Sequence, residues 1–259
     1  MNKQKNIKKR ILVKPKEMTP ICVPSELVNV NYKKGITKLM LHIYFYIYGG
    51  SIKELYFSTS YFYKWIERKE DIKRIQSYKK KEIEEIIKEW KEIGLVTVLE
   101  NVTTDAFIIR LEESFYVYGN DKYYKNFVTV YADEVEKILN IDCKDKKEID
   151  SKMILFMFLY LKQYRHLKSG QMFLVCIADD IFSRTKTARV REILELLEEQ
   201  DLIYYKKAIL KKDKYGNFLY TKFQYTLSYE RDLKNRVEYY GDEFIKQKLK
   251  ELGKEDDYE

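Results

Sequence analysis

Residues 85–96, EIIKEWKEIGLV, and residues 192–203, EILELLEEQDLI, decide the fold. Apolar side chains recur at positions 83, 86, 87, 90 and 93, and again at positions 190, 193, 194 and 197. Spacings of three and four residues are typical of an amphipathic helix. Gly94 stands where a helix ends in the left-handed conformation, and Asp201 is a poorer version of the same stop. Each stretch therefore predicts a helix that leads into a β-strand.

A second pair of stretches repeats in the same order. Residues 37–48, TKLMLHIYFYIY, and 151–162, SKMILFMFLYLK, both open with a hydroxyl residue that can cap a helix, and both continue as nearly unbroken apolar runs. A helix that is apolar all round is a buried helix. The two pairs are offset by 107 and 114 residues. This distance indicates a duplicated domain, because the repeats of solenoid proteins are much shorter.

We therefore expect two domains, at residues 20–115 and 127–230. A basic arm at 1–19 precedes them, a polar, Tyr-rich linker at 116–126 joins them, and a C-terminal helix with an acidic tail follows at 231–259. Each domain should contain an extended lead-in (21–24 and 127–131), a buried helix, a short helix (177–182 in the second domain), the amphipathic helix and a two-stranded ribbon (95–99 with 106–111, and 203–210 with 218–227). The predicted fold class is α+β, mainly α.

Helices followed by a β-hairpin resemble the winged helix-turn-helix. The stretches at 85–96 and 192–203 are similar to the segment in which the third helix of many winged-helix proteins runs into the wing. Two such domains in tandem resemble the replication initiators and replication-initiation accessory proteins of Gram-positive plasmids and phages. The part of the chain from FVTVYADEV at 127–135 to EILELLEEQDLI is similar to the N-terminal winged helix of those initiators. The resemblance implies two tandem winged helix-turn-helix domains, a module that serves DNA binding and also protein–protein contacts.

The charge balance favours an anionic partner. The chain has 49 Lys and Arg against 41 Asp and Glu, a formal net charge of +8. Such a balance points to nucleic acid first and to an anionic membrane surface second. An AT-rich genome would also raise the Lys and Tyr content without any functional cause. The placement of the charges along the chain therefore has to decide whether the basic balance reflects a nucleic-acid partner.

The scarcity of His and Cys excludes much chemistry. Two histidines, His42 and His166, and three widely spaced cysteines, Cys22, Cys143 and Cys176, make no disulfide framework, Cys-based zinc site or three-His metal site. The sequence has no phosphate-binding Gly loop. Its apolar runs are too short to cross a bilayer, and residues 1–25 carry no secretory signal. We expect a cytoplasmic, non-enzymatic protein without cofactor, metal, membrane or small-molecule substrate.

The second domain carries the stronger signal for DNA. In a helix-turn-helix the start of the second helix reads base edges in the major groove, and residues 183–191 read SRTKTARVR, without an acid. The helix dipole disfavours cations at a helix start, so this cluster favours an external anion. The alternative is a basic, solvated helix start. Arg suits guanine, and Thr suits phosphates or bases. The expected DNA contacts are Arg184, Lys186, Thr187, Arg189 and Arg191.

The hairpin that follows this helix is rich in lysine. Such a wing can track phosphates or enter the minor groove. The alternative is an exposed edge hairpin that its lysines protect against aggregation. The expected phosphate contacts are Lys207, Lys211, Lys212 and Lys214.

The first domain gives a weaker signal. Its corresponding basic segment, residues 73–81, offers Arg74, Lys79, Lys80 and Lys81, but the ribbon loop at 100–105 is acidic and polar. We expect this domain either to bind DNA through its helix alone or to pack on protein. The basic arm either lies in a DNA groove or serves as a solubilising tail.

The leading hypothesis is a sequence-specific double-stranded DNA-binding protein. By the resemblance, its role is replication initiation on a plasmid or phage, with origin repeats as the target and itself or host replication proteins as further partners. One alternative is a transcriptional repressor of a mobile element. Another is a winged-helix adaptor that binds protein in a replication or segregation complex, which the acidic tail and the acidic first ribbon fit.

Overall fold

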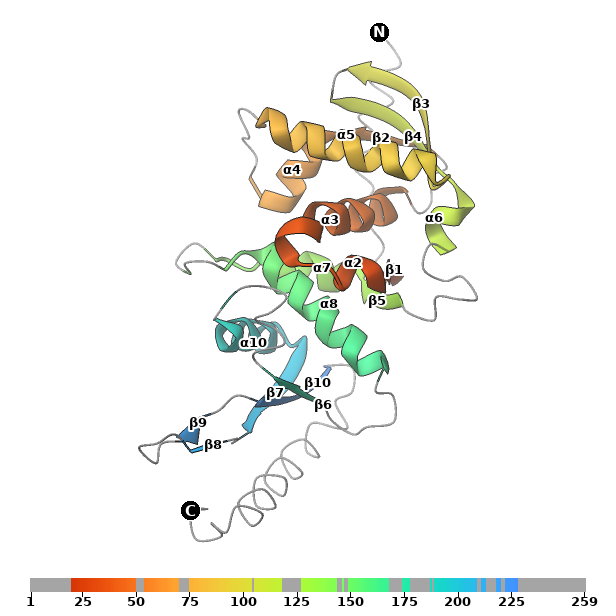
Figure 1. The fold of residues 1–259 in the computed structure, drawn as a ribbon. Coiled ribbons are helices and arrows are strands. Elements are labelled where there is room, and N and C mark those ends of the chain that lie inside the picture. The colour runs from red at the N-terminus through yellow and green to blue at the C-terminus, as the bar shows by residue number, and fades with distance from the viewer. Residues whose placement is uncertain are drawn as a thin grey trace. The chain divides into compact units, whose positions relative to one another are not determined.

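The computed structural model describes residues 20–49, 54–69, 75–103, 105–117, 127–143, 146, 149–167, 174–177, 187, 189–208, 211–212, 218–219 and 222–227. Within these residues the protein is α+β and mainly helical, with eight helices and small antiparallel sheets (Figure 1). The predicted fold class is confirmed at that level. The chain divides into two compact units, Met1–Asp142 and Cys143–Glu259, called here the first and the second unit. The expected basic arm and acidic tail lie outside the described residues.

The first unit combines short strands with helices. Its elements are β1 (Pro20–Pro24), α2 (Ser25–Val28), α3 (Tyr32–Gly49), β2 (Glu54–Ser58), α4 (Thr59–Glu67), α5 (Ser77–Glu92), β3 (Val96–Thr103), β4 (Ala106–Leu111), α6 (Glu113–Val117), β5 (Phe127–Tyr131) and α7 (Ala132–Leu139).

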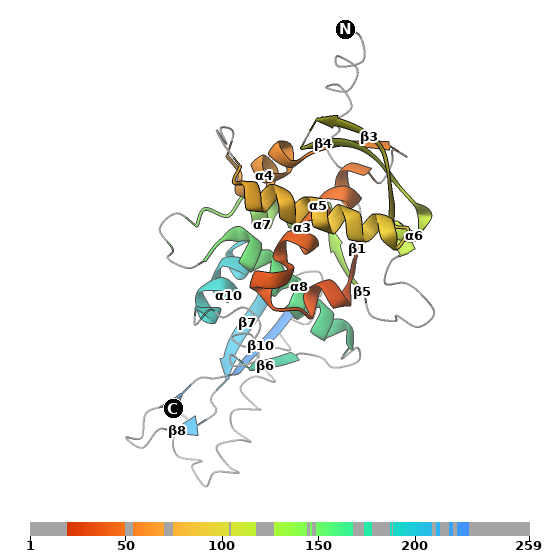
Figure 2. The ribbon, with the colours of Figure 1, turned by 45° about the horizontal axis from the view of Figure 1, so that its top comes forward.

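Helix α3 is the buried helix that the apolar run predicts. Leu39, Leu41 and Phe45 are fully buried. Phe45 meets the rings of Phe57 and Trp90 edge to face, at centroid distances of 5.2 and 5.6 Å. Aromatic pairs of this geometry add to the free energy gained by burying their area. The core of the first unit therefore forms between α3, strand β2 and helix α5, which packs on α3 (Figure 2).

The start of α3 corrects the expected cap. The sequence pattern places the helix start at Thr37, but α3 begins at Tyr32, and the Asn31 side chain accepts a hydrogen bond from the backbone N–H of Lys33 at 3.1 Å. In the second unit the carboxylate of Asp150 accepts the N–H of Met153 at 2.8 Å. Asn and Asp are strong capping residues, and each stands just before its helix.

The hairpin belongs to a three-stranded sheet. Strand β4 lies between β3 and β2, and both pairings are antiparallel. The expectation of a two-stranded ribbon is therefore wrong, because β2 adds a third strand from Glu54↔Arg110 to Ser58↔Ala106. The run ELYFS is short and continues directly into α4, so its alternation of buried Leu55 and Phe57 is hard to recognise in the sequence.

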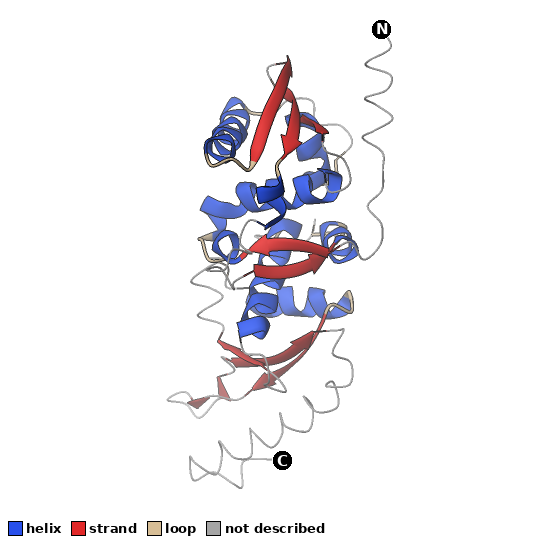
Figure 3. Cartoon of the chain, turned by 90° about the vertical axis from the view of Figure 1, so that its right-hand side faces the viewer, coloured by secondary structure: helices blue, strands red, loops and turns tan. Residues whose placement is uncertain are grey.

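The two extended lead-ins pair with each other. Strands β1 and β5 form an antiparallel ribbon, which Figure 3 shows apart from the sheet that carries β3 and β4. Ile21 faces Val130 and Val23 faces Val128, and all four are buried. The sequence assigns β5 to the second domain, whereas the contacts group it with the first unit, which extends to Asp142.

The second unit repeats the sheet order. Its elements are α8 (Ser151–Leu167), β6 (Leu174–Ile177), α10 (Val190–Glu199), β7 (Ile203–Ala208), β8 (Lys211–Lys212), β9 (Phe218–Leu219) and β10 (Lys222–Leu227). Strand β10 lies between β6 and β7, just as β4 lies between β2 and β3. Ile177 ends β6 and does not begin a helix, because it pairs with Lys222. The rest of the short helix expected at 177–182 lies outside the described residues.

Both units enter the hairpin through the same helix stop. In the first unit, the N–H groups of Leu95 and Gly94 donate to the carbonyls of Trp90 and Lys91 at 2.8 and 3.1 Å. In the second, Leu202 and Asp201 donate in the same way to the two carbonyls of residues 197 and 198, at 3.0 and 2.8 Å. These are Schellman motifs. Gly94 has φ +73° and Asp201 has φ +54°, which confirms the left-handed stops.

Candidate nucleic-acid interface

Helices α4 and α5 form the helix pair of the first unit that the sequence relates to DNA. Helix α5 is held on the core by the buried side chains of Ile83, Ile86, Ile87 and Trp90. The opposite face, which includes Tyr78, Lys81 and Glu85, is exposed. Its first turn carries no acid. The positive end of the helix dipole at this start attracts anions.

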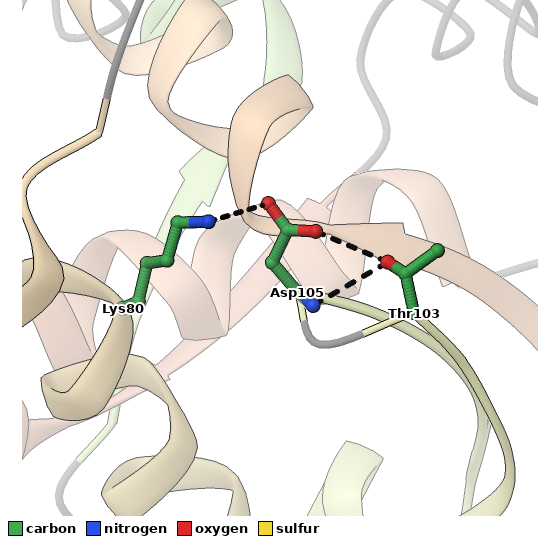
Figure 4. A network of polar contacts seen from close by, with 3 residues as sticks. All are labelled: Lys80, Thr103 and Asp105. Atoms are coloured by element: carbon green, nitrogen blue, oxygen red, sulfur yellow. Dashed lines mark hydrogen bonds and ion pairs between the residues drawn. The ribbon is translucent and has the colours of Figure 1, made fainter.

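One carboxylate joins the start of α5 to the hairpin. Asp105, at the turn between β3 and β4, accepts a hydrogen bond from the ammonium of Lys80 at 3.0 Å and from the hydroxyl of Thr103 at 3.0 Å (Figure 4). The Ser60 side chain adds a further hydrogen bond. The backbone carbonyl of Asp105 accepts the N–H of Thr59, the first residue of α4, at 2.9 Å. One turn residue thus contacts both helices of the pair.

The charge of this carboxylate is stabilised. The hydrogen bond from Lys80 is the largest cause that lowers the pKa of Asp105, and the hydroxyls of Thr103 and Ser60 act in the same direction. Asp105 is therefore ionised at neutral pH. The positive charge of Lys80 and the negative charge of Asp105 largely cancel at the surface.

The neighbouring lysines are also paired. Lys79 lies 3.1 Å from the carboxylate of Glu67 and 4.8 Å from the centre of the Tyr63 ring. Lys81 lies 3.8 Å from Glu85, but its side chain is 77% exposed, whereas those of Lys79 and Lys80 are 31% and 34% exposed. Of these three predicted DNA contacts, Lys81 is the one whose charge is most accessible. Arg74, the fourth, lies outside the described residues.

In the second unit the structure describes the last part of the predicted contact segment. Thr187 is buried, with 2% of its surface exposed, and its hydroxyl accepts the N–H of Arg189 at 3.1 Å. Little of the Thr187 surface is therefore accessible in the described structure, and its contact with DNA stays a prediction. Arg184 and Lys186 lie outside the described residues.

Two arginines flank the start of α10. Arg189 lies 3.2 Å from Glu192, and Arg191 lies 2.7 Å from Glu195 and is 61% exposed. The side chain of Tyr205, on β7, also hydrogen-bonds Arg191. Burial, with help from Glu195, raises the pKa of Tyr205 to about 12, so its hydroxyl stays protonated. These contacts connect the start of α10 with the first strand of the hairpin.

The lysine-rich hairpin is described through its backbone. Lys207 lies in β7, and Lys211 and Lys212 form β8, which pairs with β9. The pairing of β7 with β10 is thus present, but β6 adds a third strand to it, so the two-stranded ribbon expected here is wrong as well. Lys214 lies outside the described residues. The chain matches no protein-family model, and no curated protein matches it.

Two exposed tyrosines and Asp105 are the features that the sequence analysis missed. Tyr78, in the first turn of α5, is 62% exposed, and Tyr61, in α4, is 39% exposed. The apolar stripe that begins at Ile83 could have placed Tyr78 on the outer face, because five residues make one full helical turn and about 140° more. The contact of Asp105 with Lys80 joins residues far apart in the chain, and no local pattern predicts it.

The one histidine whose side chain is described has a structural role. His42 is fully buried, and its Nε2–H donates to the carbonyl of Cys22 at 2.9 Å. Burial lowers the pKa of His42 to about 4, and the hydrogen bond to Cys22 opposes this. The ring is neutral at pH 7 and stacks on Phe115 at a centroid distance of 4.8 Å.

Among the described residues, His, Cys, Asp and Glu nowhere gather in a group of three that could hold a metal ion. None of the described helices combines the length and the apolar character needed to cross a membrane.

Proposed function

We propose that this chain is a sequence-specific double-stranded DNA-binding protein built from two winged helix-turn-helix domains. By its resemblance to initiators of Gram-positive plasmids and phages, its role is to recognise origin repeats and start replication. The protein acts by binding, without catalysis.

The repeated order of elements supports the winged-helix assignment. Each unit runs from a long helix (α3 or α8) through a short strand to an amphipathic helix (α5 or α10), and then into an antiparallel hairpin whose last strand is central in the sheet. This order is that of a helix-turn-helix followed by a wing. The same Schellman motif before β3 and β7 supports a common origin of the two units.

One observation carries the DNA-binding proposal. Arg191 stands in the first turn of α10, with most of its side chain exposed, and its contacts run to Glu195 and to Tyr205 of the hairpin strand. An exposed ion pair within a helix is worth less than about 1 kcal/mol. A guanine edge or a phosphate can therefore replace Glu195, since an arginine binds either in a bidentate manner.

The test is fluorescence-anisotropy binding to duplexes tiled from the DNA around the gene, against a shuffled control, at low and high salt. We expect localised binding that keeps its preference at high salt. Arg191→Ala should weaken binding to the target by about 1–3 kcal/mol and relax specificity at one position. Arg110→Ala is the matched control, because Arg110 is 45% exposed and is also paired with a glutamate, but lies on β4 of the first unit.

Two results would contradict the proposal. Equal weakening of target and shuffled DNA by Arg191→Ala would exclude base reading by this residue. Uniform binding that collapses with salt would reduce the interaction to non-specific attraction. The layout of bound sites separates initiation from repression, since iterated sites indicate an origin and a single site indicates an operator.

A specific feature of the first unit favours an adaptor as the second candidate. Strand β3 is an edge strand that exposes Leu99 and Val102 beside Glu100, and it has no Lys or Arg between 96 and 103. Such an edge suits pairing with a protein strand more than contact with phosphates. Glutamate substitutions at Lys211 and Lys212 should leave binding intact if the partner is a protein.

A further inference from the structure

In the first unit, a lysine of the α4–α5 helix pair is already paired with a carboxylate of the same unit. Lys80 stands in α5 at the start of the helix, where a helix-turn-helix meets DNA. Its ammonium is bound to Asp105, whose carboxylate also accepts a hydrogen bond from the Thr103 hydroxyl (Figure 4). The contact is partly shielded, with 34% of the Lys80 side chain and 24% of the Asp105 side chain exposed.

The backbone keeps Asp105 in this position. Its carbonyl accepts the N–H of Thr59, and its own N–H approaches the Thr103 hydroxyl at 3.4 Å. The carboxylate therefore lies beside α5 whether or not Lys80 is bound to it. A phosphate that approaches Lys80 meets a fixed negative charge, and it must replace a charge-assisted hydrogen bond that already exists.

We propose that Asp105 is an autoinhibitory contact that holds Lys80 back from DNA, so that a phosphate binds Lys80 only after it displaces the carboxylate. The proposal rests on the DNA-binding function proposed above and deepens it. The contact keeps the first unit weak on non-specific DNA, because a phosphate that arrives without further contacts gains little from the exchange. Binding through this unit then depends on a site that engages the rest of the surface.

The second unit differs at the corresponding position. The offset of 107 residues that relates α5 to α10 places Lys80 opposite Thr187, which is buried and contacts the backbone of Arg189. In the second unit this position therefore carries no cation that a carboxylate could hold. The restraint is thus a property of the first unit, and the two units contribute differently to binding.

The experiment measures the affinity of the full chain for a random-sequence duplex at about 50 and about 200 mM salt. Asp105→Asn should bind roughly fivefold more tightly at the lower salt, and its logarithmic salt slope should be steeper by about 0.9, the value for one additional phosphate contact. Glu85→Gln is the matched control, because it also removes one acid next to a lysine of α5, but from an exposed pair.

A double-mutant cycle assigns the gain to Lys80. The double variant Lys80→Gln with Asp105→Asn keeps the net charge of the unchanged protein. It should bind the random duplex about as weakly as that protein, because the lysine that would contact the phosphate is gone. Lys81→Gln should weaken binding in both backgrounds, because Lys81 is 77% exposed. If Asp105→Asn fails to fold, the salt slopes of the two lysine variants still decide. Lys81→Gln should reduce the slope by about 0.9 and Lys80→Gln should leave it unchanged, and equal reductions would overturn the proposal.

The outcomes separate the two proposals. Absence of DNA binding in the unchanged protein would overturn the proposed function and the autoinhibitory contact together. If Asp105→Asn strengthens binding no more than Glu85→Gln does, the autoinhibitory contact alone would be overturned.

Tryptophan emission monitors folding of the first unit, because both tryptophans of the chain, Trp65 and Trp90, belong to it.

Discussion

At the scale of single residues, the helix stops at Gly94 and Asp201 show how one backbone angle controls an element. Each residue has a positive φ, and each precedes a buried leucine, Leu95 or Leu202, that begins the hairpin segment. Glycine adopts this angle freely, and aspartate tolerates it better than most residues. The first unit therefore meets the requirement at less backbone strain than the second.

We expect Gly94→Ala to destabilise the first unit by about 1 kcal/mol. A Cβ at Gly94 would meet nothing within 4 Å, so the cost arises from φ +73° alone and not from a clash. Gly94→Asn should lose less, because Asn tolerates the left-handed conformation. Denaturant unfolding, monitored by tryptophan emission, measures the loss of stability in both variants. Equal losses for Ala and Asn would contradict this explanation.

The buried histidine predicts a pH dependence of stability. His42 has a pKa of about 4 in the folded unit and about 6.5 when unfolded. As the pH decreases, the unfolded state therefore binds the proton before the folded state does. The free energy of unfolding falls by about 3 kcal/mol between pH 6.5 and pH 4. His42→Gln, which keeps an N–H donor for Cys22, should flatten this part of the profile. An unchanged slope would exclude His42 as its source.

At the scale of elements, Glu136 connects α7 to the end of α4. Its carboxylate accepts the indole N–H of Trp65 at 3.1 Å and pairs with Arg68 at 2.6 Å. Arg68 itself has φ +50°, and its guanidinium lies 6.0 Å from the Trp65 ring. Burial and the charge of Glu136 raise the pKa of Tyr48 to about 12. The segment after β5 is thus attached to the first unit by side chains as well as by the β1–β5 ribbon.

We expect a coupling of about 1 kcal/mol between Arg68 and Glu136, since their side chains are 29% and 32% exposed and solvent screens the pair. The double-mutant cycle of Arg68→Ala and Glu136→Gln measures it by denaturant unfolding. Glu136→Gln should accelerate the hydrogen exchange of the α7 amides relative to the unchanged protein, and it should accelerate that of the α5 amides less. Additive effects of the two substitutions would show that the pair contributes nothing.

At the scale of the whole molecule, the two units share an order of elements but differ in charge. In the first unit the lysines at the start of α5 are paired with acids, and the hairpin strand β3 exposes apolar side chains. In the second, the hairpin carries a run of lysines. We infer a division in which the second unit supplies most of the attraction to DNA and the first unit modulates it.

Replacing Lys207, Lys211, Lys212 and Lys214 by glutamate should therefore weaken binding to target and shuffled duplexes by the same factor and reduce the salt slope. Phosphate contacts carry no sequence information, which is the reason for the uniform loss. Glutamate at Lys33, Lys34, Lys88 and Lys91, which are exposed on α3 and α5, provides the matched control, because it changes the net charge by the same amount. A loss confined to the target would contradict a phosphate-tracking role of this hairpin.

Local patterns in the sequence predicted the long buried helices α3 and α8, the amphipathic helices α5 and α10, their stops at Gly94 and Asp201, and the hairpins. These features depend on residues close together in the chain, where periodicity and turn chemistry act directly. The same patterns singled out Lys79, Lys80 and Lys81 as basic residues at a helix start, and they carried no information about the partners of these lysines.

The tertiary structure alone decided the remaining features. Strands β2 and β6 exist because β4 and β10 offer them a free edge, and β1 pairs with β5 across more than a hundred residues. Lys80 is bound to Asp105 because the hairpin turn and the start of α5 meet there. The free energy of such contacts comes from packing and charge pairing between parts of the chain whose proximity no local pattern encodes.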